Sequence, residues 1–170
     1  MTRLFLLLLV ATVMTSCGTP VREGGDPSAE TLKTEVDGVA KQVLPQLTDA
    51  LGVKPTGLQA DFIERGGFGL WDYGASGQFV APQGTPDVLA ESITKAMTDV
   101  GLSVKTDSLG AVVGSRGNVV VRLTVGTSVV PGSSRTLALV DISIGSRQPT
   151  SEGEDFAESA PPEDYLAFVE

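Results

Sequence analysis

The sequence predicts an α+β domain in which two helices pack on one face of a mainly antiparallel sheet of about five or six strands. Apolar residues recur at helical spacing in two stretches, and the other apolar runs are short and alternate with polar residues. The order is helix, two strands, helix, then three or four strands, which favours hairpins over parallel crossovers. The chain has 170 residues and is 41% hydrophobic, enough for one domain with its own core.

The first helix is predicted between Asp26 and Gly52. Asp26 and Pro27 suit the N-cap and the first helical position, and Gly52 suits the end. The apolar stripe between them consists of Leu32, Val36, Val39, Val43, Leu47 and Leu51. Pro45 lies inside this stretch and removes one backbone hydrogen bond, so we expect a kink or a break beside it.

Two strands are predicted next, over residues 58–64 and 68–80, with a turn at Gly66 and Gly67. Alternation places Leu58, Ala60 and Phe62 on one face of the first strand and Trp71, Tyr73, Ala75 and Phe79 on one face of the second. The aromatic stripe could bind a sugar, but a sheet face covered by helices is the more frequent use of such a pattern.

The second helix begins at Thr85 and Pro86 and ends at Gly101, with a stripe of Val88, Leu89, Ile93, Met97 and Val100. Strands are then predicted over residues 102–106, 111–114, 119–125 and 136–144, joined as a meander with a hairpin turn at 115–118. In the last strand, Val140, Ile142 and Ile144 mark the better core face.

The C-terminal residues 146–170 lose this periodicity. They carry three prolines, and seven acidic residues against Arg147, namely Glu152, Glu154, Asp155, Glu158, Glu163, Asp164 and Glu170. This composition predicts an acidic, disordered tail after a domain that spans residues 27–145. The apolar stretch 165–169 is an exception, which could dock on the domain or present a short peptide to a partner.

The N-terminal segment has the three parts of a secretory signal. Arg3 precedes an apolar run over residues 4–13, and the small residues Thr15 and Ser16 precede Cys17, the only cysteine of the chain. The apolar run is about ten residues long, whereas a membrane-spanning helix needs about twenty.

This segment resembles the lipobox of bacterial lipoproteins, with Thr15, Ser16, Cys17 and Gly18 matching and Met14 standing where leucine is usual. The resemblance implies that residues 1–16 are a cleaved signal peptide and that Cys17 carries acyl chains such as palmitate. Residues 17–26 would then form a flexible tether on the outer face of the cell membrane. The layout of the rest is similar to that of small lipoproteins of high-GC Gram-positive bacteria.

Composition excludes several classes of function. The chain has no histidine, which removes catalysis by Ser-His-Asp or Cys-His groups and histidine ligation of zinc. Its net charge of −9 argues against nucleic acid as a partner.

The best carboxylate cluster is Asp61, Glu64 and Asp72, which could serve acid-base chemistry or bind a cation, although a solvated strand face is the more common role.

The sequence therefore predicts a membrane-anchored lipoprotein with a non-catalytic binding or structural role at the cell envelope. It predicts no catalytic residue, metal or cofactor. The partners would be the membrane, through the lipid on Cys17, and an envelope protein that the sequence does not identify. The alternative is a carrier that holds an apolar ligand such as a lipid between its helices and its sheet.

Overall fold

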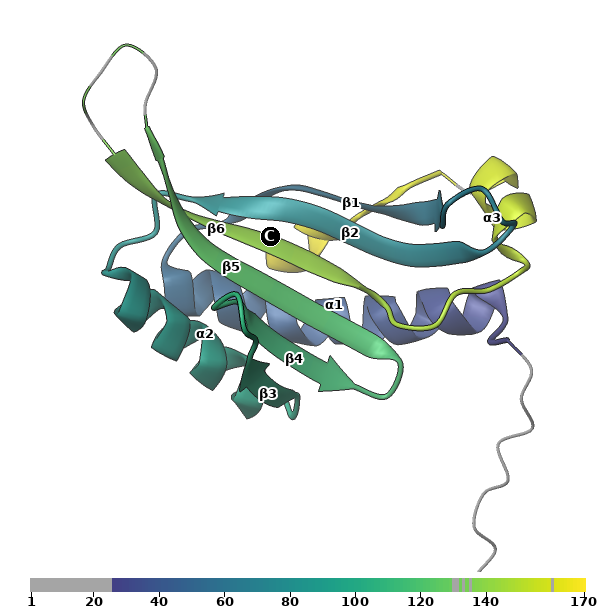
Figure 1. The fold of residues 1–170 in the computed structure, drawn as a ribbon, viewed down its shortest axis with the longest axis horizontal. Helices are drawn as coiled ribbons and strands as arrows, with labels where there is room; N and C mark the ends of the chain where they lie inside the picture. Colours follow the sequence, from purple (N-terminus) through teal and green to yellow (C-terminus); the bar gives the residue numbers. More distant parts are fainter. Residues whose placement is uncertain (1–25, 130–131, 133, 135, 160) are drawn as a thin grey trace, which may run out of the picture.

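The computed structural model describes residues 26–129, 132, 134, 136–159 and 161–170 (Figure 1). The predicted signal peptide, Cys17 and residues 17–25 of the predicted tether lie outside this part of the chain. The described residues form one antiparallel sheet of seven strands in the order β3-β4-β5-β6-β2-β1-β7. Figure 1 shows α1 and α2 on the same face of this sheet.

The α+β class and the antiparallel sheet are confirmed, whereas the predicted numbers of elements are too low. The described chain has three α-helices, seven strands and a final 3₁₀ helix. One helix, one strand and the 3₁₀ helix come from the segment predicted to be disordered. The elements are α1 (Ala29–Leu51), β1 (Pro55–Glu64), β2 (Trp71–Val80), α2 (Pro86–Asp99), β3 (Ser103–Thr106), β4 (Val112–Arg116), β5 (Val119–Val129), β6 (Thr136–Ser146), α3 (Gly153–Ser159), β7 (Glu163–Asp164) and η1 (Tyr165–Val169).

The first helix starts two residues later than the Asp26 and Pro27 pair predicts. Ser28 is the N-cap, and its side-chain oxygen accepts a 3.2 Å hydrogen bond from the backbone nitrogen of Thr31. The helix continues through Pro45 to Leu51, so the break considered beside Pro45 does not occur. Val43 and Leu44 before Pro45 and Leu47 after it are fully buried, and this packing offsets the lost hydrogen bond.

The sheet joins two units that the sequence predicts. The hairpin of β1 and β2 is confirmed, as is the meander from β3 to β6. The two units join where β6 pairs with β2, with Ile144 opposite Ala75 and Val140 opposite Phe79. Both residues of each pair are at most 5% exposed, so the junction lies over the core.

The core fills the space between the helices and one face of the sheet. The predicted inward faces of β1, β2 and β6 are buried there, and α2 contributes Leu89, Ile93 and Met97. Val88, which the helical spacing also placed in the stripe, is 52% exposed. Because side chains occupy this space, a ligand or partner would meet another surface, such as the opposite face of the sheet.

The prediction of a disordered tail is wrong for the described residues of 146–170. Helix α3, strand β7 and η1 all lie in this segment, and β7 pairs with β1 at the edge of the sheet. Tyr165 is fully buried. The folded domain therefore extends past residue 145 and includes η1. The apolar side chains between the acidic residues and prolines of this segment pack against the rest of the domain.

Candidate functional site

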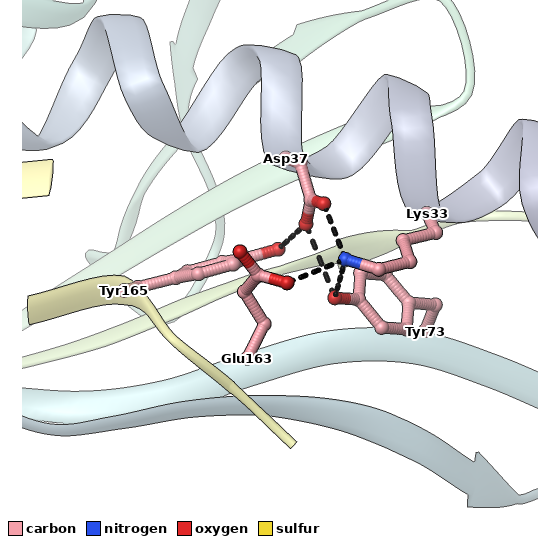
Figure 2. Close-up of polar contacts among 5 residues, drawn as sticks. All are labelled: Lys33, Asp37, Tyr73, Glu163 and Tyr165. Atoms are coloured by element: carbon pink, nitrogen blue, oxygen red, sulfur yellow. Dashed lines mark hydrogen bonds and ion pairs between the residues drawn. The ribbon is translucent and has the colours of Figure 1, made fainter. Parts of the chain in front are cut away.

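A partly buried cluster of polar side chains joins α1, β2 and the C-terminal segment. We call it the Asp37 cluster, and it consists of Lys33, Asp37, Tyr73, Glu163 and Tyr165 (Figure 2). Oδ1 of Asp37 accepts hydrogen bonds from the phenols of Tyr165 at 2.6 Å and Tyr73 at 3.1 Å. Oδ2 forms a 2.6 Å ion pair with Nζ of Lys33. The same Nζ lies 2.8 Å from Oε2 of Glu163. Both oxygens of Asp37 are therefore occupied.

Burial and hydrogen bonding set the protonation of this cluster. Burial and the charge of Asp37 raise the pKa of Tyr73 to about 12. Burial and the hydrogen bond donated to Asp37 raise the pKa of Tyr165 far above its ordinary value. Partial burial works to lower the pKa of Lys33, but its hydrogen bonds to Asp37 and Glu163 outweigh that effect and raise the pKa overall. Near neutral pH both phenols are therefore neutral donors and Lys33 is charged.

The arrangement of the Asp37 cluster is structural. Tyr73 is 2% exposed and Asp37 is 8% exposed, and the groups satisfy one another. A general acid or base needs a free atom within reach of a substrate. Here the hydrogen-bonding capacity of the carboxylate holds the C-terminal segment against α1.

Further contacts attach the same segment to the domain. The backbones of Trp71 and Thr150 exchange two hydrogen bonds of 2.8 Å, and a Cβ at Gly153 would lie 2.1 Å from the Cβ of Trp71. The ring of Phe156 lies 5.7 Å from that of Phe62. The C-terminal segment is thus held by polar and apolar contacts along its length.

The second candidate site is a groove on the uncovered sheet face. Its volume is about 540 Å³, and it crosses β1, β2, β6 and β5. The strand register brings its side chains into two rows, with Ser143 between Ser76 and Arg122 and Asp141 between Gln78 and Thr124. We call these six residues the sheet-face groove.

The groove is polar and has little net charge. Arg122 forms an ion pair with Asp107, and Gln78 donates a 3.0 Å hydrogen bond from Nε2 to Asp141 Oδ1. Beside it, Gly74 lies opposite Gly145, and a Cβ at Gly74 would lie 2.5 Å from the carbonyl oxygen of Ile144. Hydroxyls, an amide, a carboxylate and one guanidinium therefore offer both donors and acceptors. The glycines beside them carry no side chain, so the surface of the sheet is lower there.

The structure does not assemble the predicted carboxylates into a site. Asp72 accepts a 2.8 Å hydrogen bond from Nε of Arg65, Glu64 accepts one from the backbone of Gly69, and Asp61 accepts one from the backbone of Phe62. Within the described ranges, no three acidic or cysteine side chains are grouped so that they could hold a metal ion.

The other predicted residues have simple outcomes. The aromatic stripe belongs to the core, as predicted, because Tyr73 and Phe79 are at most 2% exposed and Trp71 is half-buried. Cys17 lies outside the described residues, so its lipidation stays a prediction.

Sequence reasoning missed the residues of both candidate sites. For the Asp37 cluster, a signal was present in the sequence. Lys33 and Asp37 are four residues apart, so they lie side by side on the helix, and each directly follows a residue of the apolar stripe, which places the pair at the border of the core. For the groove, Arg122 and Asp141 are charged residues that lie between apolar residues in their strands, and this alternation marks the face turned away from the core.

Comparison with known proteins adds no relative. The sequence matches no protein-family model, and the comparisons with curated proteins and with solved structures found no match. In the part of the chain that the structure describes, no helix has both the length and the apolar character needed to cross a bilayer. The fold thus defines an α+β protein with an open antiparallel sheet, and its function must be argued from its surfaces.

Proposed function

We propose that this chain is a lipid-anchored, non-catalytic binding protein of the cell envelope, and that the sheet-face groove is its binding surface. The single observation that carries the proposal is that one face of the seven-stranded sheet is covered by helices while the other holds the groove. Antiparallel sheets can leave one face in water, so exposure alone is ordinary. This exposed face also has a hollow lined by two aligned rows of hydrogen-bonding side chains, and such a hollow is typical of a recognition surface.

The chemistry of the groove favours a polar protein surface as the partner. Arg122 and Asp141 are opposite charges, and Asp107 already pairs with Arg122, so the groove does not concentrate positive charge for phosphate. The two rows combine donors and acceptors at the spacing of neighbouring strands, which suits the amides and hydroxyls of another protein. Arginine is also enriched at the energetic centres of protein interfaces.

The predicted lipid anchor on Cys17 supports the same proposal, because it would determine where the protein acts. Acyl chains on Cys17 would hold the domain at the outer face of the membrane, where the partner would be another envelope protein. The alternative, a carrier of an apolar ligand, needs space between the helices and the sheet. That space is filled by the core side chains, so no observation favours the carrier.

Crosslinking on intact cells with quantitative mass spectrometry tests the binding surface. We expect Arg122→Ala to reduce the crosslinked partner by about tenfold, the effect of losing one interfacial hot spot. Glu35→Ala, an exposed charge on α1, is the matched control and should leave the partner unchanged. Equal recovery from both variants would exclude the groove as the binding surface.

A further inference from the structure

Strand β5 is paired on both sides for only part of its length in the described structure. Strand β4 pairs with Val119–Leu123 only, whereas β6 pairs with β5 over its full length to Val129. Among the described residues, no strand or backbone hydrogen bond meets the other side of Thr124–Val129. In an antiparallel strand, alternate residues turn both backbone groups to the same side, so about half of this stretch points its N–H and C=O groups outward.

The edge projects away from the rest of the fold. Figure 1 shows the adjoining ends of strands β5 and β6 extending beyond β1 and β2 and away from the helix layer. Thr127, Ser128 and Val129 are exposed, and Val129 is 64% exposed although it lies on the same side of the strand as the buried Val121 and Leu123. The outer end of β5 is therefore free for another strand to approach.

This edge lacks the protection that sheet edges usually carry. Charged residues, proline, bulges and short length all discourage edge pairing. Strand β3, at one end of the sheet, is four residues long and contains Lys105, and β7 covers part of β1 at the other end. In contrast, the stretch from Thr124 to Val129 has no charge and no proline, and its pairing with β6 shows no bulge.

We propose that Val125–Val129, within this edge, pairs antiparallel with the same stretch of a second copy of this chain. A two-fold axis normal to the sheet keeps the helices of both copies on one face of the joined sheet. Residues that oppose each other across the axis then point their side chains to the same face. With the axis at Thr127, Thr127 faces its own copy, Val125 faces Val129, and Gly126 faces Ser128. Apolar residues then meet apolar residues, small meets small, and no charge opposes a like charge.

This self-complementarity is why the occupant is a second copy and not a different strand. A strand edge that binds a different protein does not need to be complementary to a second copy of itself across a two-fold axis. A chain of net charge −9 also needs a charge-free contact to approach its own copy. One short strand pair is smaller than a standard interface of about 1,600 Å², so the dimer is expected to depend on concentration.

Disulfide trapping on intact cells tests the pairing. The full chain carrying Thr127→Cys, treated with a mild oxidant, should give a band of twice the monomer mass on a non-reducing gel. Ser103→Cys is the matched control, because Ser103 is exposed on another edge strand, and it should give no such band. Equal bands from the two variants, or no band from Thr127→Cys, would overturn the proposal. A band from the wild type would instead report a free Cys17 thiol and contradict the lipid anchor.

Charge variants give a second, independent readout. In native mass spectrometry of the full chain, Thr127→Lys should self-associate about tenfold more weakly than the wild type, because two lysines oppose each other at the axis. Mixing Thr127→Lys with Thr127→Glu should restore the dimer as a mixed species. A wild type that stays monomeric as its concentration rises, or a mixture that stays monomeric, contradicts the pairing.

Discussion

The phenol of Tyr165 donates a 2.6 Å hydrogen bond to Oδ1 of Asp37 and so joins η1 to α1. Tyr165 is fully buried and Asp37 nearly so. Removing one partner of a buried hydrogen bond leaves the other without water or protein to replace it. The last six residues are therefore part of the folded structure, and their loss should be measurable as a loss of stability.

Tyr165→Phe keeps the ring and removes only the donor. We expect the free energy of unfolding to fall by about 1–3 kcal/mol, because Asp37 loses one of its hydrogen bonds inside the protein. Urea unfolding measures the change. Ser103→Ala, which removes an exposed hydroxyl on β3, should change it by less than about 0.5 kcal/mol. Equal effects of the two variants would show that the hydrogen bond does not hold the segment.

Gly153→Ala should release the start of α3 from Trp71. The added Cβ would lie 2.1 Å from the Cβ of Trp71, so one of the two backbones must move. Trp71 is the only tryptophan, and its fluorescence should shift to longer wavelength as water reaches it. Gly38→Ala is the matched control.

Gly38 lies in α1, and nothing lies within 4 Å of a Cβ placed there. Alanine is favoured over glycine inside a helix by about 1 kcal/mol, so this variant should be equally or more stable, with unchanged fluorescence. A Gly153→Ala variant that matches Gly38→Ala in stability and fluorescence would mean that α3 does not pack closely on Trp71.

Alkaline pH should destabilise the fold. The pKa of Tyr73 is raised to about 12 and that of Tyr165 is raised further, whereas unfolded tyrosine titrates near about 10. The unfolded chain therefore loses these protons first, and stability that is complete below about pH 10 falls as the pH rises.

The slope is expected to be about 1.4 kcal/mol per pH unit for each fully shifted group. Urea unfolding at a series of pH values measures it, and Tyr165→Phe should have a shallower slope than the wild type. Identical slopes would show that Tyr165 does not titrate differently in the two states.

Cys17→Ala tests the anchor. If Cys17 carries acyl chains, the wild type should sediment with membranes and the variant should not, because the acyl chains supply the membrane affinity. The mass of the purified wild type should exceed that of its peptide chain by the lipid. A wild type that stays in the supernatant, or whose mass is that of the bare chain, would contradict the anchor.

Periodicity predicted most of the fold, because burial on one face leaves a pattern in every long element. Leu58, Phe62, Ile93 and Val140 all lie where their spacing places them. The C-terminal segment was missed because its few apolar residues, such as Tyr165, have no regular spacing and are buried only by contact with distant elements. No local pattern carries that information.

The candidate groove was missed for a different reason. It is made from single residues of separate strands, such as Ser76, Ser143 and Arg122, and only the strand order brings them into one row. The sequence predicted the six strands β1 to β6 and the β1–β2 hairpin, but it predicted neither β7 nor the pairing of β6 with β2. A short polar residue on an outward strand position is also common in any antiparallel sheet.

The most direct test of the proposed binding surface is site-specific photocrosslinking on intact cells. A photoreactive residue replaces Ser143 in the groove, or Glu35 on the exposed side of α1 as the control. The account predicts one protein adduct from position 143 that falls by about tenfold when Arg122→Ala is added, and no such adduct from position 35. No adduct from position 143, or the same adduct from both positions, would contradict it.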